Sequence, residues 1–328
     1  MIRSAVRCIS KFLIFVFPLV SEAAPNRIDV ISGFRIFDMP ITLESTKNKG
    51  FSIQNLYPFD YEKIVVPDDP QIRKIIFINC ILENIAIFQR LPQEKMVYFL
   101  MEPFKLKDDF YSYFSRVYTW DDELVDNVKF FKLYYPYLIP MRQEIPSFEN
   151  KKFCVMVAGS EGIVNRENEL YSERVRMAEF FETKPVGEFD IYGWAWDRNR
   201  WKNYRGHIPG NHSGKQKIST LSNYRFCICF ENTKNIFGYI SEKIFSCFAA
   251  GCVPVYWGAE NIERYIPKSC FIDYRDFLDQ EKLYHFLKSM PEAVYNEYIT
   301  NIRKFLESSE SQVFSPEYFN RMFYEAVQ

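Results

Sequence analysis

The sequence predicts an α/β protein of two domains, each built around a parallel sheet. Short apolar runs alternate with segments of helical spacing along most of the chain, which is typical of strand–helix–strand units. With 328 residues, the chain is long enough for two domains of ordinary size. Hydrophobic residues make up 48% and charged residues 25%, as in a globular protein. The net charge of −1 gives no basic footprint of the kind that nucleic-acid-binding proteins show.

The N-terminus has the pattern of a targeting segment. Arg3, Arg7 and Lys11 precede the apolar run Phe12 to Val20, and small residues around Ala24 suit a cleavage site. The run is shorter than the roughly 20 apolar residues of a membrane span. A cleaved signal peptide is the main interpretation, with a membrane anchor or an amphipathic leader as the alternatives.

Four apolar runs in the first domain are candidate strands. They cover residues 28–34, 74–79, 96–101 and 116–120. Residues 81–91, between the second and third runs, have helical spacing. Because strands that alternate with helices usually pair in parallel, we expect a parallel sheet here. The stretch 140–152 contains Pro146, Ser147 and mixed charges, which is typical of a linker.

Glu102 follows the third candidate strand, directly before Pro103. A carboxylate at this edge of a sheet can face a cleft, where partial burial raises its pKa and suits it to act as a general base. On the sequence alone, an ordinary loop carboxylate is the favoured interpretation. Asp121 and Asp122, at the end of the next strand, are the competing carboxylates.

A strand and a helix open the second domain. The strand is expected over 152–160 and the helix over 170–184. Arg174 and Arg176 lie near the start of this helix, at the carboxyl end of the strand. There an arginine can bind two oxygens of one phosphate. The alternative is that both arginines are simply solvated on the surface of the helix.

The stretch 224–273 predicts a further strand–helix–strand unit. The strands are expected over 224–230 and 252–258, and Gly251 ends the intervening helix where a positive φ is favoured. The two strands should be parallel. The loop before the helix then lies at the carboxyl end of the first strand, where open α/β sheets bind ligands.

Charged and polar residues gather around the start of that helix. Lys243 lies in its first turn, where a cation opposes the helix dipole unless an anion binds there. Glu242 suits the dipole and could also accept hydrogen bonds from ribose hydroxyls. Tyr239 and Asn232, in the preceding loop, are candidate ligand contacts. The alternative, equally supported by this segment, is a helix-start carboxylate beside a solvated lysine.

Two further groups of side chains lie between these units. Trp194 and Trp196 follow a strand expected from residue 189, and either could stack on a base or sugar or belong to the core. A short helix over 215–223 carries Lys215 and Lys217, which add positive charge near the same cleft.

Cysteine and histidine usage gives no sign of a disulfide framework or a metal site. Most of the eight cysteines lie in apolar strands or helices, where a free cysteine behaves as a small hydrophobe. His207, His212 and His285 have no metal-ligand spacing, so we expect no metal.

Three helices are expected at the C-terminal end of the chain. They cover residues 279–290, 292–308 and 315–327. We divide the chain into a leader, a first domain, a second domain and a terminal helix, at residues 1–24, 25–148, 149–308 and 309–328.

The second domain carries a family resemblance. The ordered motifs FEN, TKNIFGYISEKIF, GCVPVYWG and IPKSCFIDYRDF resemble the C-terminal signature of the α1,3-fucosyltransferases, glycosyltransferase family 10. Weaker similarity extends upstream through LYSERVRMAEFF, FDIYGWAW and the YRG at 204–206. In the first domain it is limited to YFLMEP and RVYTWDDE. Overall the resemblance covers roughly residues 97–277.

The resemblance implies a glycosyltransferase B fold, in which two Rossmann-like domains face each other across the active site. It implies inverting transfer of L-fucose from GDP-β-L-fucose to a glycan hydroxyl, for instance α1,3 to N-acetylglucosamine. No metal or other cofactor is implied. The terminal helix is expected, by analogy with two-domain transferases, to cross back to the first domain.

The resemblance also implies roles for individual residues. Glu102 would be the base, although its flanking motif is not the usual one. Arg174, with Arg176 as the fallback, and Lys243 would bind the diphosphate, and Tyr239 would assist. Glu242 would hold the ribose, while Asn232 and Lys215 complete the expected donor site.

Two other functions stay open. One is a transferase that uses a different nucleotide sugar, since Arg174 and Lys243 indicate only a diphosphate. The other is a catalytically inactive protein that binds a nucleotide sugar or glycan. The expected partners are a nucleotide sugar and an oligosaccharide or glycoconjugate acceptor, without nucleic acid. The leader suggests membrane association or the secretory pathway: the Golgi in a eukaryote, the cytoplasmic membrane face in a bacterium.

Overall fold

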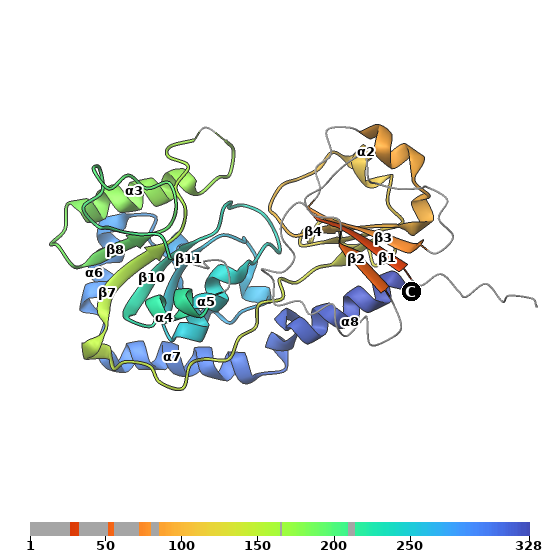
Figure 1. The fold of residues 1–328 in the computed structure, drawn as a ribbon. Helices are drawn as coiled ribbons and strands as arrows, with labels where there is room; N and C mark the ends of the chain where they lie inside the picture. Colours follow the sequence, from red (N-terminus) through yellow and green to blue (C-terminus); the bar gives the residue numbers. More distant parts are fainter. Residues whose placement is uncertain (1–26, 33–51, 56–71, 80–84, 165, 209–213) are drawn as a thin grey trace, which may run out of the picture.

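A computed structural model describes residues 27–32, 52–55, 72–79, 85–164, 166–208 and 214–328. The N-terminal leader lies outside these residues, as do Cys8, Cys80 and His212. The described chain contains two six-stranded parallel sheets, each with helices packed against it (Figure 1). None of the helices described is long and apolar enough to cross a membrane.

The first sheet has the strand order β2–β1–β3–β4–β5–β6. Its strands are β1 Arg27–Ser32, β2 Ser52–Asn55, β3 Ile72–Ile78, β4 Met96–Leu100, β5 Arg116–Thr119 and β6 Phe130–Lys132. All neighbouring pairs are parallel, as the sequence predicts. β2 and β6 are additional to the four expected strands. β6 is a three-residue edge strand whose side chains are all half-buried, so it has no alternating pattern to detect.

The segment expected as a helix over 81–91 is described from residue 85, and there it is not an α-helix. It forms a 3₁₀ helix, η2 Ile85–Arg90. Pro92 disfavours the α conformation in Leu91, which shortens any helix that precedes it. A second 3₁₀ turn, η3 Gln93–Lys95, leads into β4, and the short α2 Asp108–Tyr111 precedes β5.

The second sheet has the strand order β12–β11–β10–β7–β8–β9, and its strand pairs are also all parallel. Its strands are β7 Lys152–Val157, β8 Phe189–Tyr192, β9 Tyr204–Gly206, β10 Tyr224–Phe230, β11 Val253–Trp257 and β12 Ile272–Asp273. The strand–helix–strand unit expected over 224–273 is therefore confirmed as β10, α5 and β11.

Helices cover both faces of the second sheet. They are α3 Tyr171–Glu182, α4 Lys215–Leu221, α5 Glu242–Ala250, α6 Gln280–Ser289 and α7 Glu292–Glu307. Cys227 and Cys229 of β10 pack on the face covered by α4 and α5, whereas Phe226 and Ile228 pack on the face with α3 and α6. Successive side chains of a strand point to opposite faces, so β10 is buried on both. The six described cysteines are free and buried, as expected.

The last helix, α8 Pro316–Val327, returns to the first sheet, which confirms the expected crossing (Figure 1). Phe319 and Phe323 pack against Phe99 of β4, with ring centroids 5.8 and 5.7 Å away. Arg73 of β3 donates from Nε to the carbonyl of Val327 at 2.8 Å. The chain therefore ties its C-terminus to its first sheet.

A polar contact also joins the two domains beside the sheets. Asp122, which follows β5, accepts hydrogen bonds from Asn261 at 2.7 Å and from the Tyr265 hydroxyl at 2.6 Å. Lys132 of β6 lies 2.6 Å from Asp122 and donates to the carbonyl of Gly238 at 3.2 Å. These contacts fix the loop between β10 and α5 against the first domain.

Candidate active site

A cavity of about 240 Å³ lies between the carboxyl ends of the two sheets. Its walls include Glu102 from the first domain and five residues from the second, namely Arg174, Asn232, Tyr239, Glu242 and Lys243. Six of the seven predicted site residues are thus brought together. The seventh, Lys215, is not among the lining residues.

The N-terminus of α5 forms one wall of this cavity. Ser241 caps the helix, and its hydroxyl accepts a hydrogen bond from the Lys243 amide at 3.4 Å. Gly251 ends the helix with φ +62°, as the sequence predicts. Lys243 is the second residue of the helix, so its ammonium group lies where the dipole favours negative charge.

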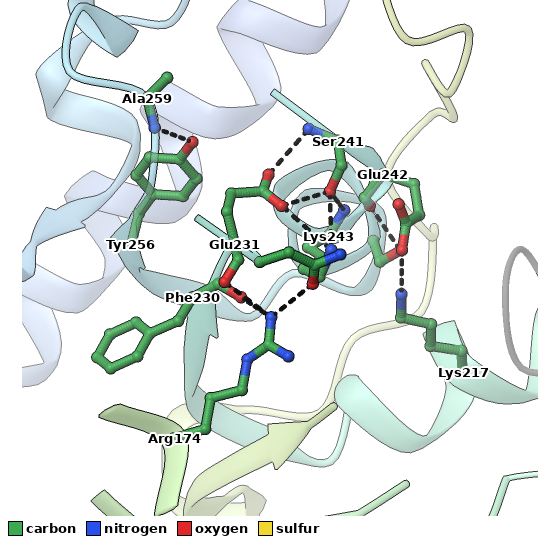
Figure 2. Close-up of polar contacts among 11 residues, drawn as sticks. Arg174, Lys217, Phe230, Glu231, Ser241, Glu242, Lys243, Tyr256 and Ala259 are labelled. Atoms are coloured by element: carbon green, nitrogen blue, oxygen red, sulfur yellow. Dashed lines mark hydrogen bonds and ion pairs between the residues drawn. The ribbon is translucent and has the colours of Figure 1, made fainter. Parts of the chain in front are cut away.

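Glu231 holds Lys243 in this position. The carboxylate is fully buried at the end of β10 and accepts hydrogen bonds from the Ser241 amide at 2.8 Å and hydroxyl at 2.7 Å. Lys243 Nζ lies 3.1 Å from the same carboxylate, as Figure 2 shows. Burial alone would lower the pKa of Lys243, but the negative charges of Glu231 and Glu242 raise it. The lysine is therefore charged, and its carboxylate partner is fixed by two further bonds.

Arg174 reaches the same place from α3. Its Nη2 donates to the carbonyls of Phe230 and Glu231, both at 2.8 Å, and to Asn232 Oδ1 at 2.9 Å. All three bonds converge on one terminal nitrogen (Figure 2). The side chain is only 2% exposed, and its buried Nε has no hydrogen-bond partner among the described residues. A buried donor without a partner costs about 1–3 kcal/mol, which a bound anion would relieve.

Arg176, the fallback, does not face the cavity. It lies two positions further along α3, about 200° around the helix, and pairs with Glu173 at the surface. Half of its side chain is exposed. Of the two arginines, the structure therefore brings only Arg174 to the cavity.

Glu102 lies directly after Met101, beyond the end of β4. Its backbone amide donates to Asn79 Oδ1 at 3.0 Å, and its carbonyl accepts from Trp120 Nε1 at 2.9 Å. No described residue makes a hydrogen bond to its carboxylate. Burial raises the pKa of Glu102, and Lys243 opposes the shift. The carboxylates of Glu242 and Glu231 add to the rise.

The two competing carboxylates, Asp121 and Asp122, make their contacts outside the cavity. Asp121 is buried 3.5 Å from Lys105 Nζ and does not line the cavity. Asp122 makes the contact between domains, where hydrogen bonds from Lys132 and Tyr265 outweigh burial and lower its pKa. The chain thus offers Glu102 as the first-domain carboxylate of this cavity.

Lys217 lines the cavity in place of Lys215. The two residues lie two positions apart on α4, about 200° around the helix, so they point in different directions. Lys217 is 5% exposed, and its Nζ lies 3.4 Å from Glu242 Oε1. The sequence indicates a lysine on this helix, but placing the correct one requires the orientation of the helix in the fold.

The two tryptophans after β8 have different environments. Trp196 belongs to the core, where its Nε1 donates to the Ala158 carbonyl at 2.8 Å. Trp194 lines the cavity and is 51% exposed. Tyr239 also lines the cavity, packed edge to face against Trp120 with ring centroids 5.5 Å apart.

Some cavity residues were missed by reasoning from the sequence. Glu231 looks like the boundary of a strand, and no pattern reveals that it is fully buried beneath Lys243. Tyr135 lines the cavity from a segment without a motif, and His207 lines it after β9. Tyr171 also lines it, but in the motif LYSERVRMAEFF only the arginines indicated a ligand. The described residues contain no group of three or more histidine, cysteine, aspartate or glutamate side chains that could hold a metal ion.

The arrangement is that of a two-domain glycosyltransferase of the B type, and comparisons with solved structures agree. The structure of an α1,3-fucosyltransferase with GDP-fucose matches with a TM-score of 0.57. The match is 14% identical and covers 95% of this chain and 94% of that one. T4 phage BGT in complex with UDP and Mn²⁺ matches with a TM-score of 0.52 at 16% identity, covering 92% and 99%. At such identities the likeness shows the fold.

The family is shown by the sequence of the second domain. Residues 150–321 match the model of the C-terminal region of glycosyltransferase family 10 (fucosyltransferase), and the chain belongs to this family. An α-(1,3)-fucosyltransferase of Helicobacter pylori is 32% identical over 74 residues, 23% of this chain and 15% of that protein. The mouse 4-galactosyl-N-acetylglucosaminide 3-α-L-fucosyltransferase 9 is 41% identical over 78 residues, 23% of this chain and 21% of that enzyme. The matches span only about a fifth of these relatives.

Proposed function

We propose that the protein transfers L-fucose from GDP-β-L-fucose to a hydroxyl of an acceptor glycan, with inversion at the anomeric carbon. The observation that carries the proposal is the shared cavity, in which Glu102 from one domain faces Arg174 and Lys243 from the other. A carboxylate of raised pKa opposite a pair of fixed cations suits a reaction that removes a proton and releases a diphosphate.

In the proposed reaction Glu102 accepts the proton of the acceptor hydroxyl. The hydroxyl oxygen forms a bond to C1 of fucose as the bond from C1 to the diphosphate oxygen breaks, and GDP leaves. Attack from the face opposite the diphosphate produces inversion. The negative charge on the departing GDP is stabilised by Arg174 and Lys243.

Four further residues complete the proposed donor site. Glu242, at the first position of α5 and paired with Lys217, would hold the ribose hydroxyls. Tyr239 would assist at the diphosphate, and Asn232 fixes the Arg174 guanidinium. Lys217 replaces Lys215 in this proposal because it is the lysine of α4 that lines the cavity.

The relatives suggest the acceptor. The mouse relative is named for transfer to position 3 of N-acetylglucosamine in a galactosyl-N-acetylglucosaminide. We extend this to the present chain as a proposal of α1,3 transfer to N-acetylglucosamine or a similar sugar. Membrane association through the N-terminal leader, in the Golgi of a eukaryote or on the cytoplasmic membrane face of a bacterium, is proposed on the sequence alone.

GDP release by the full chain, with GDP-fucose as donor, tests the proposal. We expect release to accelerate when an N-acetyllactosamine acceptor is added. Parallel reactions with GDP-mannose and UDP-sugars test the alternative that the chain uses another nucleotide sugar as donor. An absence of both GDP-fucose binding and GDP release would exclude fucose as the transferred sugar.

A further inference from the structure

Trp194 is an exposed aromatic side chain held in a fixed place on the cavity wall. Half of its surface is exposed, and it lines the cavity with Arg174 and Lys243. Its neighbour Trp196 is buried in the core with a hydrogen-bonded indole, so the same loop fixes one tryptophan and presents the other. A large exposed ring that lines a cavity of charged groups needs an explanation other than packing.

The backbone at Gly159 lies in close contact with the indole ring of Trp194. A Cβ added at Gly159 would lie 2.5 Å from both Cε2 and Nε1 of Trp194, so the indole lies directly against the glycine. The Ser160 amide donates to the Trp194 carbonyl at 3.1 Å, and the Ala158 amide donates to the Tyr192 carbonyl at 2.9 Å. The loops after β7 and β8 are thus joined on either side of the contact, and the Gly159 backbone supports the indole.

The position of Trp194 relative to the cations indicates what it contacts. Trp194 follows β8, and β7 separates β8 from β10, whose end carries Glu231 and Asn232. Two strand spacings amount to about 10 Å. Figure 1 shows β8 further from the first sheet than β10 is. The loop after β8, which carries Trp194, therefore lies on the side of the β10 end that is remote from the first domain and Glu102.

The order of Glu102, the cations and Trp194 along the cavity indicates how a nucleotide sugar would be oriented there. Its diphosphate connects the sugar with the nucleoside, and the sugar must lie towards Glu102 for Glu102 to act as the base. The nucleoside then extends the other way, towards β7 and β8. The spacing of about 10 Å between β10 and β8 leaves room for a ribose beside the cations, so the base would reach Trp194.

We propose that Trp194, supported by Gly159, is the stacking platform for the nucleotide base of the donor. The inference rests on the proposed function, because it takes the orientation of the donor from the role of Glu102. Aromatic side chains stack on any nucleobase, and removal of one stacking partner by alanine substitution weakens binding by about 5-fold to 150-fold. Trp194 thereby supplies affinity for the nucleoside that the phosphate-binding cations do not provide.

Calorimetric titration of the full chain with GDP and, separately, with pyrophosphate tests the platform. We expect Trp194→Ala to weaken GDP binding by about 10-fold to 100-fold and to leave pyrophosphate binding within about 2-fold. Trp194→Phe retains a stacking ring and should recover most of the affinity. Phe286→Ala, which removes an exposed ring from α6 outside the cavity, is the control and should bind GDP as the parent does.

A second variant separates stacking from general damage. Gly159→Ala places a methyl group against the indole and should weaken GDP binding in the parent. In the Trp194→Ala background the same substitution should have little further effect, because the ring that it displaces is gone. Fluorescence gives an independent readout: GDP should quench the parent, and Trp194→Phe should lose most of that quenching.

Three other outcomes would each overturn the proposal that Trp194 is a stacking platform. Equal GDP affinity in the parent and in Trp194→Ala would overturn the platform and leave the proposed function intact. Equal losses for GDP and pyrophosphate would also overturn it, since the cation site itself would have changed. A parent chain that binds neither GDP nor GDP-fucose would remove the proposed function and the platform with it.

Discussion

The two walls of the cavity are built in different ways. On the second-domain side, Lys243 is fixed by Glu231 and Ser241, and Arg174 is fixed by three bonds to Nη2. On the first-domain side, Glu102 is anchored through its backbone, and its carboxylate makes no hydrogen bond to a described residue. Contacts within the chain itself organise one wall, and the other presents a carboxylate that can accept a proton.

This difference has a chemical reason. Groups that stabilise a developing charge act best when their dipoles and charges are already oriented, because no reorganisation is then needed during the reaction. A general base must instead keep a lone pair available, and hydrogen bonds to its charged form would lower its pKa and weaken it as a base. The contrast implies that substitutions on the two walls affect different steps.

The largest effect is expected at Glu102. Glu102→Gln keeps the size of the side chain and removes the proton acceptor, so transfer should fall about 10²-fold to 10⁴-fold. Donor affinity should stay within about 2-fold, because the fixed cations are untouched. Single-turnover transfer and GDP-fucose titration on the same preparation measure the two quantities.

An unchanged transfer rate in Glu102→Gln would contradict this division of roles. It would mean that a group other than Glu102 accepts the proton of the acceptor hydroxyl. Asp121→Asn is a control only for folding, because Asp121 is buried and pairs with Lys105 outside the cavity.

A smaller effect is expected on the other wall. Lys243→Ala removes one charged donor and should weaken GDP binding about 10-fold to 100-fold, since hydrogen bonds to charged groups contribute about 1.5–3 kcal/mol each. Its matched control is Lys215→Ala, which also removes a lysine at a helix start and should bind GDP as the parent does. If Lys215→Ala and Lys243→Ala weakened GDP binding equally, long-range charge rather than the fixed contact would explain the affinity.

The sequence predicted the organised wall better than the other. The position of Lys243 follows from local rules, because Ser241 can cap a helix and Gly251 can end it. The shared sequence motifs are also concentrated there. Local rules cannot identify Glu231 as the ion-pair partner of Lys243. Glu231 lies twelve residues before Lys243, and only the folded β10–α5 unit brings their side chains together.

The choice between neighbouring candidates needed the fold as well. Lys215 and Lys217 share a helix, and Trp194 and Trp196 share a loop, so composition and spacing do not distinguish the members of either pair. The rotation of α4 about its axis determines which lysine lines the cavity, and the fit of the loop against Gly159 determines which tryptophan does. Both depend on contacts between segments far apart in the sequence.

The pH dependence of transfer should sharpen the contrast further. Glu102 must be deprotonated to act, and its pKa is raised by burial and by Glu242 and Glu231, so transfer should be lost on acidification at a higher pH than for an ordinary glutamate. Glu242→Gln removes one of the raising charges and should shift the acidic limb to lower pH. The measurement is kcat against pH at saturating GDP-fucose. A limb that did not move in Glu242→Gln would indicate that another group controls it.

The smallest effect is expected from metal removal. The fold does not decide this point, since T4 phage BGT, which shares it, is described with UDP and Mn²⁺. Here Arg174, Lys243 and the N-terminus of α5 already place positive charge at the proposed diphosphate site. We therefore expect transfer after exhaustive treatment with EDTA to stay within about 2-fold of the untreated rate. A loss that Mn²⁺ or Mg²⁺ restores would mean that the organised wall supplies only part of the charge, and the donor would then carry a metal ion into the site.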